Sequence, residues 1–285
     1  YEGVNLKHCY RTFFSRDCEG CRDVMFCIDC LDCHDCIGSS NLRKKSYYIF
    51  NRPYSKEEYF LKVKELDLGS RKNLILVKEE AGRIALITPR KFVHGRMNVN
   101  VFGEYVYESR NAQNVYDVRE TENIRYSQFL KSVPSGTTDS YDYSSFGNTA
   151  ELIYESVWAG LQVSNLKFCL WNYGAQNLEY CFGCHSSKDL FGSVGLRNKQ
   201  YCILNRQYSA EEFQNMVQKI KRQMDVMPYT DKVGRIYRYG EFFPSELSPF
   251  GYNETWAYDY FPSTKENLTA DGFHWKEPED KSYPI

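Results

Sequence analysis

The stretch YCFGCHSSKDLFGSVGLRNKQYCILNRQYSAEEF, from Tyr180 to Phe213, has an earlier counterpart in FCIDCLDCHDCIGSSNLRKKSYYIFNRPYSKEEY, from Phe26 to Tyr59. Both copies pass from a cysteine-rich part through a basic segment to a Glu-Glu pair. The matched residues are Cys27 and Cys30 with Cys181 and Cys184, Leu42-Arg43 with Leu196-Arg197, Asn51-Arg52 with Asn205-Arg206, and Glu57-Glu58 with Glu211-Glu212. Internal repetition is a strong guide to architecture, so this alignment predicts a duplicated fold.

A shorter repeat runs through each copy. A polar residue followed three positions later by Phe, Tyr or a small residue recurs every twelve residues, as in Arg11–Phe14, Asp23–Phe26 and Asp35–Gly38. Short periods with small and polar residues at the turns are typical of solenoids, in which each coil stacks on the last. The sequence therefore predicts a mainly β fold of duplicated β-solenoid (β-helix-like) arrays. Because Phe, Tyr and Leu recur in the repeat, we expect each coil to hold two repeats, so that its interior has room for them.

A helix is expected after each array. Ser55 with Glu58 and Ser209 with Glu212 have the form of capping boxes, and apolar residues follow at helical spacing. Between the arrays, the β-branched runs 73–77 and 84–87 flank a polar turn, which predicts a hairpin insertion. After Pro228 the chain is irregular and rich in aromatic residues. Since a solenoid needs covered ends, this region is expected to be an aromatic C-terminal cap.

These patterns divide the chain into four predicted segments. Residues 1–69 form the first cysteine-rich array with its helix, and 70–99 form the hairpin and a linker. Residues 100–227 form the second array with its helix, and 228–285 form the capping segment.

Bulk composition excludes little. The 285 residues carry 36 Lys and Arg against 37 Asp and Glu, so a net charge of −1 gives no global signal for nucleic acid. No apolar run is long enough to span a membrane, which predicts that the protein has no membrane partner. The eleven cysteines are an odd number in Cys-x-x-Cys spacing, which favours reduced thiols or metal ligands over a disulfide framework. We therefore expect a cytoplasmic protein.

Two stretches resemble a known group. LFGSVGLRNKQYCILNRQYSAEEF, from Leu190, and GEFFPSELSPFGYNETWAYDYFPSTKE, from Gly240, are similar to motifs of uncharacterised cysteine-rich repeat proteins of candidate-phyla bacteria. Members of that group often carry flanking zinc ribbons, and Ser193 stands where they usually have Cys. The resemblance implies a bacterial repeat core and assigns no activity.

Zinc is the first candidate ligand. Cys18, Cys21, Cys30 and Cys33 form two Cys-x-x-Cys pairs, and four thiolates suit a tetrahedral zinc ion. The competing interpretation, which we favour, is a ladder in which Cys recurs as a small apolar residue of the solenoid interior. In the second copy Cys181 and Cys184 with His185 supply only part of a site, which weakens the case for zinc there.

A nucleic-acid surface is the second candidate. Basic residues beside tyrosines resemble a surface that contacts phosphates and stacks on bases, and they occur at related positions in both copies. They are Arg43, Lys44, Lys45, Arg52, Arg197, Lys199 and Arg206, beside Tyr47, Tyr48, Tyr54, Tyr201 and Tyr208. The alternative is that they are solvated residues where the last coil turns into a helix.

Catalysis has the weakest support. Parallel β-helices can carry polysaccharide-cleaving carboxylates, and the nearest acidic grouping here is Asp139, Asp142, Glu151 and Glu155. Aromatic rows at Trp158, Trp171 and Tyr173 could receive a sugar or a protein, although stacking in the core is the favoured interpretation. The five histidines show no ligand or acid–base spacing.

Together these patterns predict a non-enzymatic binding or assembly scaffold that contacts nucleic acid or a nucleoprotein. A carbohydrate-active β-helix enzyme and a zinc-stabilised protein-interaction module are the alternatives. A protein partner or self-association fits the scaffold interpretation equally well.

Overall fold

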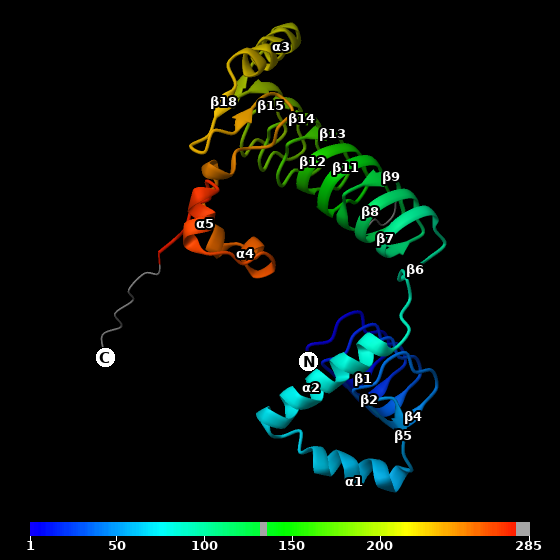
Figure 1. The fold of residues 1–285 in the computed structure, drawn as a ribbon. Coiled ribbons are helices and arrows are strands. Elements are labelled where there is room, and N and C mark those ends of the chain that lie inside the picture. The colour runs from blue at the N-terminus through cyan, green and yellow to red at the C-terminus, as the bar shows by residue number, and fades with distance from the viewer. Residues whose placement is uncertain (132–135, 278–285) are drawn as a thin grey trace, which may run out of the picture. The chain divides into compact units, whose positions relative to one another are not determined.

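The computed structural model describes residues 1–131 and 136–277, and the chain divides into two compact units (Figure 1). Unit 1 spans Tyr1–Phe92 and unit 2 spans Val93–Ile285. Over the described residues of the whole chain strand exceeds helix, and most strands pair in parallel, so the mainly β prediction is confirmed.

Unit 1 is built on one sheet whose strand order follows the sequence. Its strands are β1 (Tyr10–Phe13), β2 (Arg22–Met25), β3 (His34–Ile37), β4 (Ser46–Ile49) and the short antiparallel β5 (Arg52–Pro53). Each of β1 to β3 pairs in parallel with the next strand, and two further rows of single bridges lie beside them, from Val4 to Ser40 and from Lys7 to Arg43. The chain thus returns alongside itself at several points of each turn. We call one such turn a rung.

The rungs are shorter than predicted. Tyr10 pairs with Arg22 and Arg22 with His34, so one repeat of twelve residues makes a whole rung. The prediction of two repeats in each coil is wrong. It assumed that the aromatic side chains must fit inside, whereas Phe14 and Phe26 lie outside the rungs and stack on each other with ring centroids 4.8 Å apart. That separation matches the ~4.8 Å spacing of neighbouring strands.

A three-residue period underlies the rung. From Glu2 to Phe50 every third residue has a positive φ, and between Phe14 and Gly38 the residue after it points inward. Asn, Asp and Gly tolerate this left-handed conformation better than other residues, which explains the polar landmarks of the repeat. The inward residues of unit 1 are small because so short a rung encloses little space: Ser15, Cys18, Cys21, Val24, Cys27, Cys30, Cys33, Cys36 and Ser39 are all buried.

Two helices cover the outer aromatic row of unit 1. The helix α1 (Lys56–Leu66) begins at the predicted capping box, in which Ser55 and Glu58 exchange side-chain and backbone hydrogen bonds. The helix α2 (Arg71–Ile87) follows after a short turn. Tyr59 from α1 and Val77 and Ala81 from α2 form one apolar cluster with Phe26.

The predicted hairpin in residues 70–99 is wrong, because α2 occupies its place. The β-branched runs 73–77 and 84–87 favour strands, but the residues that contact the rungs follow a helical period. Val77, Ala81 and Ala85 are buried at four-residue spacing, while Ile75, Leu76 and Leu86 are exposed. Tertiary packing of that narrow small-residue stripe outweighs the β propensity of the individual residues.

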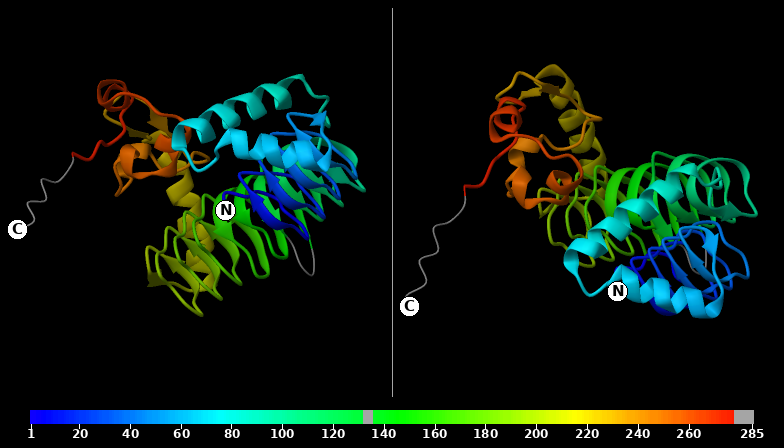
Figure 2. Two further views of the ribbon diagram at one scale, coloured as in Figure 1. Left: turned by 90° about the horizontal axis from the view of Figure 1, so that it is seen from below. Right: turned by 60° about the horizontal axis from the view of Figure 1, so that its bottom comes forward.

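Unit 2 is built on a longer sheet whose strands are again mostly parallel. Its main sheet contains β6 (Gly95–Arg96), β7 (Val99–Tyr107), β8 (Arg110–Arg119), β9 (Thr121–Arg125), β10 (Gln128–Lys131), β11 (Thr137–Phe146), β12 (Ala150–Ala159), β13 (Val163–Lys167), β14 (Gln176–Glu179), β15 (Lys188–Phe191), β16 (Gln200–Ile203) and β17 (Arg206–Gln207). The described rungs lie side by side in Figure 2. From β13 onward the register again advances by one twelve-residue rung at a time, as Ser164 pairs with Gln176 and Gln176 with Lys188.

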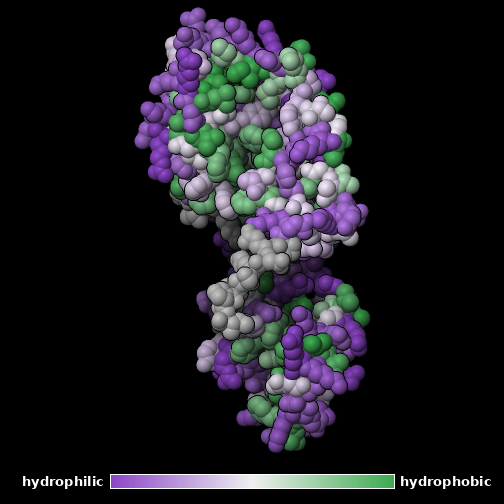
Figure 3. Space-filling model, turned by 90° about the vertical axis from the view of Figure 1, so that its left-hand side faces the viewer, coloured by the Kyte–Doolittle hydropathy of each residue, from purple (hydrophilic) through white to green (hydrophobic). Residues whose placement is uncertain are grey.

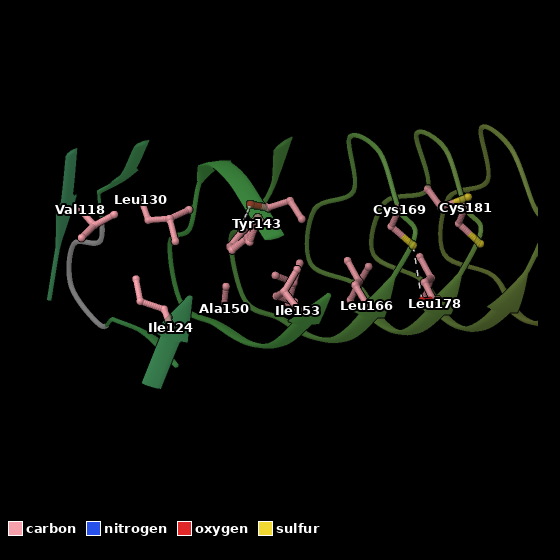
Figure 4. Close-up of a cluster of buried hydrophobic side chains, with 14 of the residues drawn as sticks. Val118, Ile124, Leu130, Tyr143, Ala150, Ile153, Leu166, Cys169, Leu178 and Cys181 are labelled. Atoms are coloured by element: carbon pink, nitrogen blue, oxygen red, sulfur yellow. Dashed lines mark hydrogen bonds between the residues drawn. The ribbon is translucent and has the colours of Figure 1, made fainter. Parts of the chain in front are cut away.

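Side chains from successive rungs of unit 2 fill one continuous interior (Figure 4). Leu166, Leu178 and Leu190 form one column, and Cys169 and Cys181 lie in another. The Cys169 thiol donates to the carbonyl oxygen of Leu178 over 3.4 Å. A helix α3 (Ala210–Val226) follows the last rung, and it begins at the predicted capping box of Ser209 and Glu212.

An asparagine closes the last rung of each unit in the same way. The side-chain amide of Asn51 accepts from the backbone N–H of Ser40 over 2.8 Å and donates to its carbonyl oxygen over 3.1 Å. Asn205 makes the same pair of bonds with Val194, over 2.8 and 2.9 Å. The carboxamide stands in for the peptide group that a further rung would supply, so it satisfies backbone groups that would otherwise lack partners.

The C-terminal region contains a hairpin of β18 (Tyr229–Thr230) and β19 (Ile236–Tyr237), then the short 3₁₀ turns η1 (Ser245–Leu247) and η2 (Tyr252–Glu254). The helices α4 (Trp256–Tyr260) and α5 (Lys265–Ala270) complete it. Its contacts with the rungs lie on their flank: the Tyr180 hydroxyl donates to the Glu241 carbonyl over 3.1 Å, and the Phe243 ring meets Tyr180 edge-on. The capping role predicted for residues 228–285, of which 278–285 lie outside the described residues, stays a prediction.

Candidate functional site

The four predicted zinc ligands lie inside unit 1. Cys18 and Cys21 belong to one rung and Cys30 and Cys33 to the next, and each is about 1% exposed. Their thiols donate to backbone carbonyls; Cys30, for example, donates to Ile28 over 3.5 Å and to Ser39 over 3.6 Å. Buried thiols with backbone acceptors are what a structural ladder requires.

Neighbouring thiols and burial together control the ionisation of the interior cysteines. Burial raises the pKa of Cys36 to about 12. Hydrogen bonds from neighbouring thiols lower the pKa of both Cys21 and Cys30. All eleven cysteines are free of disulfides. Among residues 1–131 and 136–277, no three His, Cys, Asp or Glu side chains are arranged to hold a metal ion, and zinc stays a prediction.

The basic residues of unit 1 lie on and just after its last rung. Arg43 is already engaged, because its Nη2 lies 3.0 Å from Asp29 Oδ1, and Lys91 Nζ reaches the same carboxylate oxygen over 3.1 Å. Lys44, Lys45 and Arg52 are exposed. Their tyrosine neighbours are not exposed platforms for bases: Tyr47 and Tyr54 pack in the cluster under the helices, and Tyr48 packs against the interior cysteines.

The basic residues of unit 2 occupy the corresponding places. Arg197, Lys199 and Arg206 are exposed, and none of them pairs with a carboxylate in the described part of the chain. The Arg206 guanidinium lies 5.7 Å from the centre of the Tyr208 ring, while Tyr201 packs against Phe213. The structure thus provides free charge here but few free aromatic faces beside it.

Two of the four predicted acidic residues come together. Tyr141 pairs with Tyr154 across neighbouring rungs, which places Asp142 next to Glu155. Burial raises the pKa of Glu155, and the charges of Asp142 and of Glu241, which sequence reasoning did not include, act in the same direction. Asp139 instead accepts from the amide of Asn123 over 2.9 Å, and Glu151 is exposed at the far end of its strand.

A cavity of about 320 Å³ lies on the flank of unit 2. Its lining is mainly aromatic and apolar, with Tyr180, Met224 and Phe243 among its residues, and Arg238 and Glu241 add opposite charges. This size is at the lower end for pockets that bind small molecules.

The most distinctive surface is an exposed aromatic row on unit 2, and the prediction that Trp158 and Trp171 stack in the core is wrong. Their side chains are 56% and 44% exposed. Trp171 contacts the rings of Phe182 and His185, and His185 stacks on Tyr173 with centroids 5.2 Å apart. The three-residue period, once recognised in the sequence, predicts that this row is exposed, because its residues do not fall at the inward position of the rung.

Apolar residues extend this surface to the end of the rungs. Phe182 and Val194 occupy the same position on consecutive rungs and are 42% and 52% exposed, and Leu204 is 75% exposed. We call Trp171, Phe182, Val194 and Leu204 the bare face. Hydrophobic patches between hydrophilic residues are visible on the surface of unit 2 in Figure 3.

No protein-family model and no curated protein matches the chain. In the described part of the chain, no helix has both the length and the apolar character needed to cross a lipid bilayer.

Proposed function

We propose that this chain is a non-enzymatic binding scaffold, in which two β-solenoid units of a duplicated plan hold surfaces for a partner protein. The single observation that carries the proposal is the bare face. Contiguous apolar surface on a protein of this kind marks an interaction site more often than isolated exposed residues do. The stacked rungs hold Trp171, Phe182 and Val194 at fixed spacing, so the face is organised before any partner arrives.

Site-specific photo-crosslinking tests this function. A photoreactive benzoyl-phenylalanine replaces Trp171 in the full chain, expressed in its natural host, and a matched variant carries it at the exposed Gln214 of α3. We expect a discrete protein adduct from position 171 and none from position 214. An adduct with a second copy of the chain assigns the face to self-assembly, and equal labelling at both positions, or none, removes the proposal.

A nucleic-acid partner is the second candidate. It is supported by the exposed charges of Arg197, Lys199 and Arg206 on and beside the last rung, and by Lys44 and Lys45 in unit 1. Phosphate contacts of this kind make affinity fall steeply with salt. Binding of single-stranded RNA or DNA should weaken roughly 20-fold between 50 and 200 mM salt if these three residues each contact a phosphate. It should be lost when Arg197, Lys199 and Arg206 are all replaced by Gln.

The remaining alternatives have direct tests. A carbohydrate-active enzyme would use Asp142 and Glu155, whose juxtaposition supports it, and release of reducing ends from polysaccharide should then disappear in Glu155→Gln. A zinc-stabilised module would hold zinc at Cys18, Cys21, Cys30 and Cys33. Elemental analysis of purified protein, with thiol titration before and after unfolding, distinguishes bound zinc from a ladder of free thiols.

A further inference from the structure

The two units differ in what covers one outer corner of their last rungs. This corner is formed by Ile28, Ser40 and Phe50 in unit 1 and by Phe182, Val194 and Leu204 in unit 2. In unit 1 the second half of α2 lies over this corner, and Figures 1 and 2 both show α2 alongside the strands. A Cβ placed on Gly38 would lie 3.4 Å from the Cβ of Ala81, and Ile28 and Leu86 line one cavity. The corner is therefore a surface on which a helix packs closely.

Hydrogen bonds fix the end of α2 on the same corner. The Asn51 amide that closes the last rung also donates to the hydroxyl of Thr88 over 3.3 Å, and Asn41 donates to the carbonyl of Pro89 over 3.2 Å. As a result Ser40 is only 5% exposed. The rung-closing amide thus serves two purposes in unit 1, joining the backbone of Ser40 to the C-terminal end of a helix.

Unit 2 has the same corner, but within its described residues no second helix lies on it. Val194, which bonds to Asn205 as Ser40 bonds to Asn51, is 52% exposed. Phe182 corresponds to the half-buried Ile28, and Leu204 corresponds to Phe50, which packs in the cluster beneath the helices of unit 1. The side-chain amide of Asn205 bonds only to Val194 within the described residues, so the bond equivalent to that with Thr88 is unmade.

The residues around this corner are basic. Arg197 lies three residues beyond Val194, and Arg206 lies two beyond Leu204; both are exposed and neither has a carboxylate partner in the described part of the chain. A complementary partner would therefore carry acidic residues beside its apolar stripe.

We propose that the bare face binds an amphipathic α-helix of a partner protein, with small and branched residues on its apolar side and acidic residues alongside. This inference rests on the proposed scaffold function and names the class of partner. The helix would lie where α2 lies on unit 1, since helices that dock in apolar surfaces use anchors at three- and four-residue spacing. Its C-terminal end would meet the Asn205 amide.

A labelled peptide tests the inference on the full chain. The probe is Ser70–Arg90 of this protein, which carries the stripe of Val77, Ala81 and Ala85, with fluorescein at its N-terminus. A second peptide carries Lys78→Glu and Arg83→Glu. Fluorescence anisotropy should show saturable binding of both, with the acidic peptide binding at least tenfold more tightly at 50 mM salt and the difference shrinking at 500 mM.

Variants of the chain assign the binding to the bare face. Val194→Glu should weaken both peptides at least tenfold, and Arg197→Gln should remove most of the advantage of the acidic peptide. The matched control is Val226→Glu, at an exposed residue of α3, which should leave binding unchanged. Circular dichroism of each variant verifies that the fold is retained.

The outcomes separate this inference from the scaffold function. Absence of saturable binding by either peptide overturns it, as does binding that Val194→Glu leaves unchanged, which would place the peptide on unit 1 in exchange with α2. If position 171 crosslinks a partner while both peptides fail, the scaffold function stands and the helical partner is wrong. If the peptides bind but no crosslink forms, the helix-binding surface stands without a partner in the host.

Discussion

Units 1 and 2 have the same rung and the same closing asparagine, yet one hides a corner that the other exposes. Ser40 under α2 is 5% exposed, and Val194 at the matching place is 52% exposed. The interior of the rungs is filled by Cys, Ser, Val and Leu in both units, and the backbone groups pair from rung to rung. The outer surface is therefore free to differ, and equal substitutions in the two units should have unequal effects.

The unequal effects can be measured because each unit has its own probe. All four tryptophans lie in unit 2, so tryptophan fluorescence follows the unfolding of that unit alone. Unit 1 is followed through the reaction of its buried thiols Cys18, Cys21 and Cys30 with a thiol reagent in denaturant. Mass spectrometry of the labelled peptides separates them from the four buried cysteines of unit 2.

The largest difference is expected at the matched glycines Gly38 and Gly192, which both have φ near +60°. A Cβ on Gly38 would lie 2.5 Å from the Phe50 ring, held between the rungs and α2, whereas a Cβ on Gly192 meets only the exposed Leu204 at 3.0 Å. Gly38→Ala should cost about 3 kcal/mol, from left-handed strain plus overpacking, and Gly192→Ala about 1 kcal/mol from strain alone. Denaturant midpoints measure both, and equal costs would contradict the proposed difference in cover.

The closing asparagines should show the next largest difference. Asn51→Ala leaves the buried backbone of Ser40 without partners and removes the bond to Thr88, so we expect a loss of about 2 kcal/mol. Asn205→Ala exposes the backbone of Val194 to water, which can replace the lost bonds, and should cost about 0.5 kcal/mol. Each loss is read from the unfolding free energy of its own unit. A larger loss of unfolding free energy in unit 2 would mean that the bare face is covered in solution.

Some of this architecture could be predicted from the sequence because it depends on local chemistry. Both capping boxes and the twelve-residue spacing need only neighbouring residues, and the structure contains them. The width of a rung could not be predicted in this way, since Phe26 is equally apolar inside a wide coil or outside a narrow one. The three-residue period of positive φ resolves that ambiguity, but its left-handed position accepts Phe and Tyr as well as Asn and Asp.

The surfaces were harder to predict because they depend on tertiary contacts. Whether Ile28 in unit 1 or Phe182 in unit 2 is covered depends on the path of the chain after the helix that follows the rungs of that unit. In unit 1 the covering segment is α2, whose β-branched residues make its helical period hard to recognise in the sequence. The nucleic-acid hypothesis likewise assumed that Tyr47 and Tyr54 were free, although the two helices use them for packing. Charge could be placed correctly from the sequence; the availability of the neighbouring rings could not.

A smaller effect is expected at the corner itself. The Ser40 hydroxyl is buried and has no hydrogen-bond partner among the described residues, so Ser40→Ala removes a desolvated polar group. We expect unit 1 to gain about 1 kcal/mol of unfolding free energy. The matched change Val194→Ala, at an exposed residue, should alter unit 2 by less than about 0.5 kcal/mol. Destabilisation by Ser40→Ala would show that the hydroxyl has a partner in solution.

The smallest effect concerns pH, and it again separates the units. Burial against Trp171 and Tyr173, together with the charge of Arg197, lowers the pKa of His185 below its usual value, whereas Leu31 at the equivalent place in unit 1 does not titrate. The folded state then binds fewer protons than the unfolded state, so this stabilisation is complete above the unfolded pKa of about 6.5 and is lost as pH falls below it. Glu155, whose pKa is raised, acts in the opposite direction, so the useful measurement compares the native chain with His185→Leu. Between pH 7.5 and 5.5 the native unit 2 should lose slightly more stability than the variant, monitored by tryptophan fluorescence, while unit 1 responds alike in both. An identical response of unit 2 in the two proteins would mean that His185 is as well solvated when folded as when unfolded, and that the aromatic row around it is more open than the structure shows.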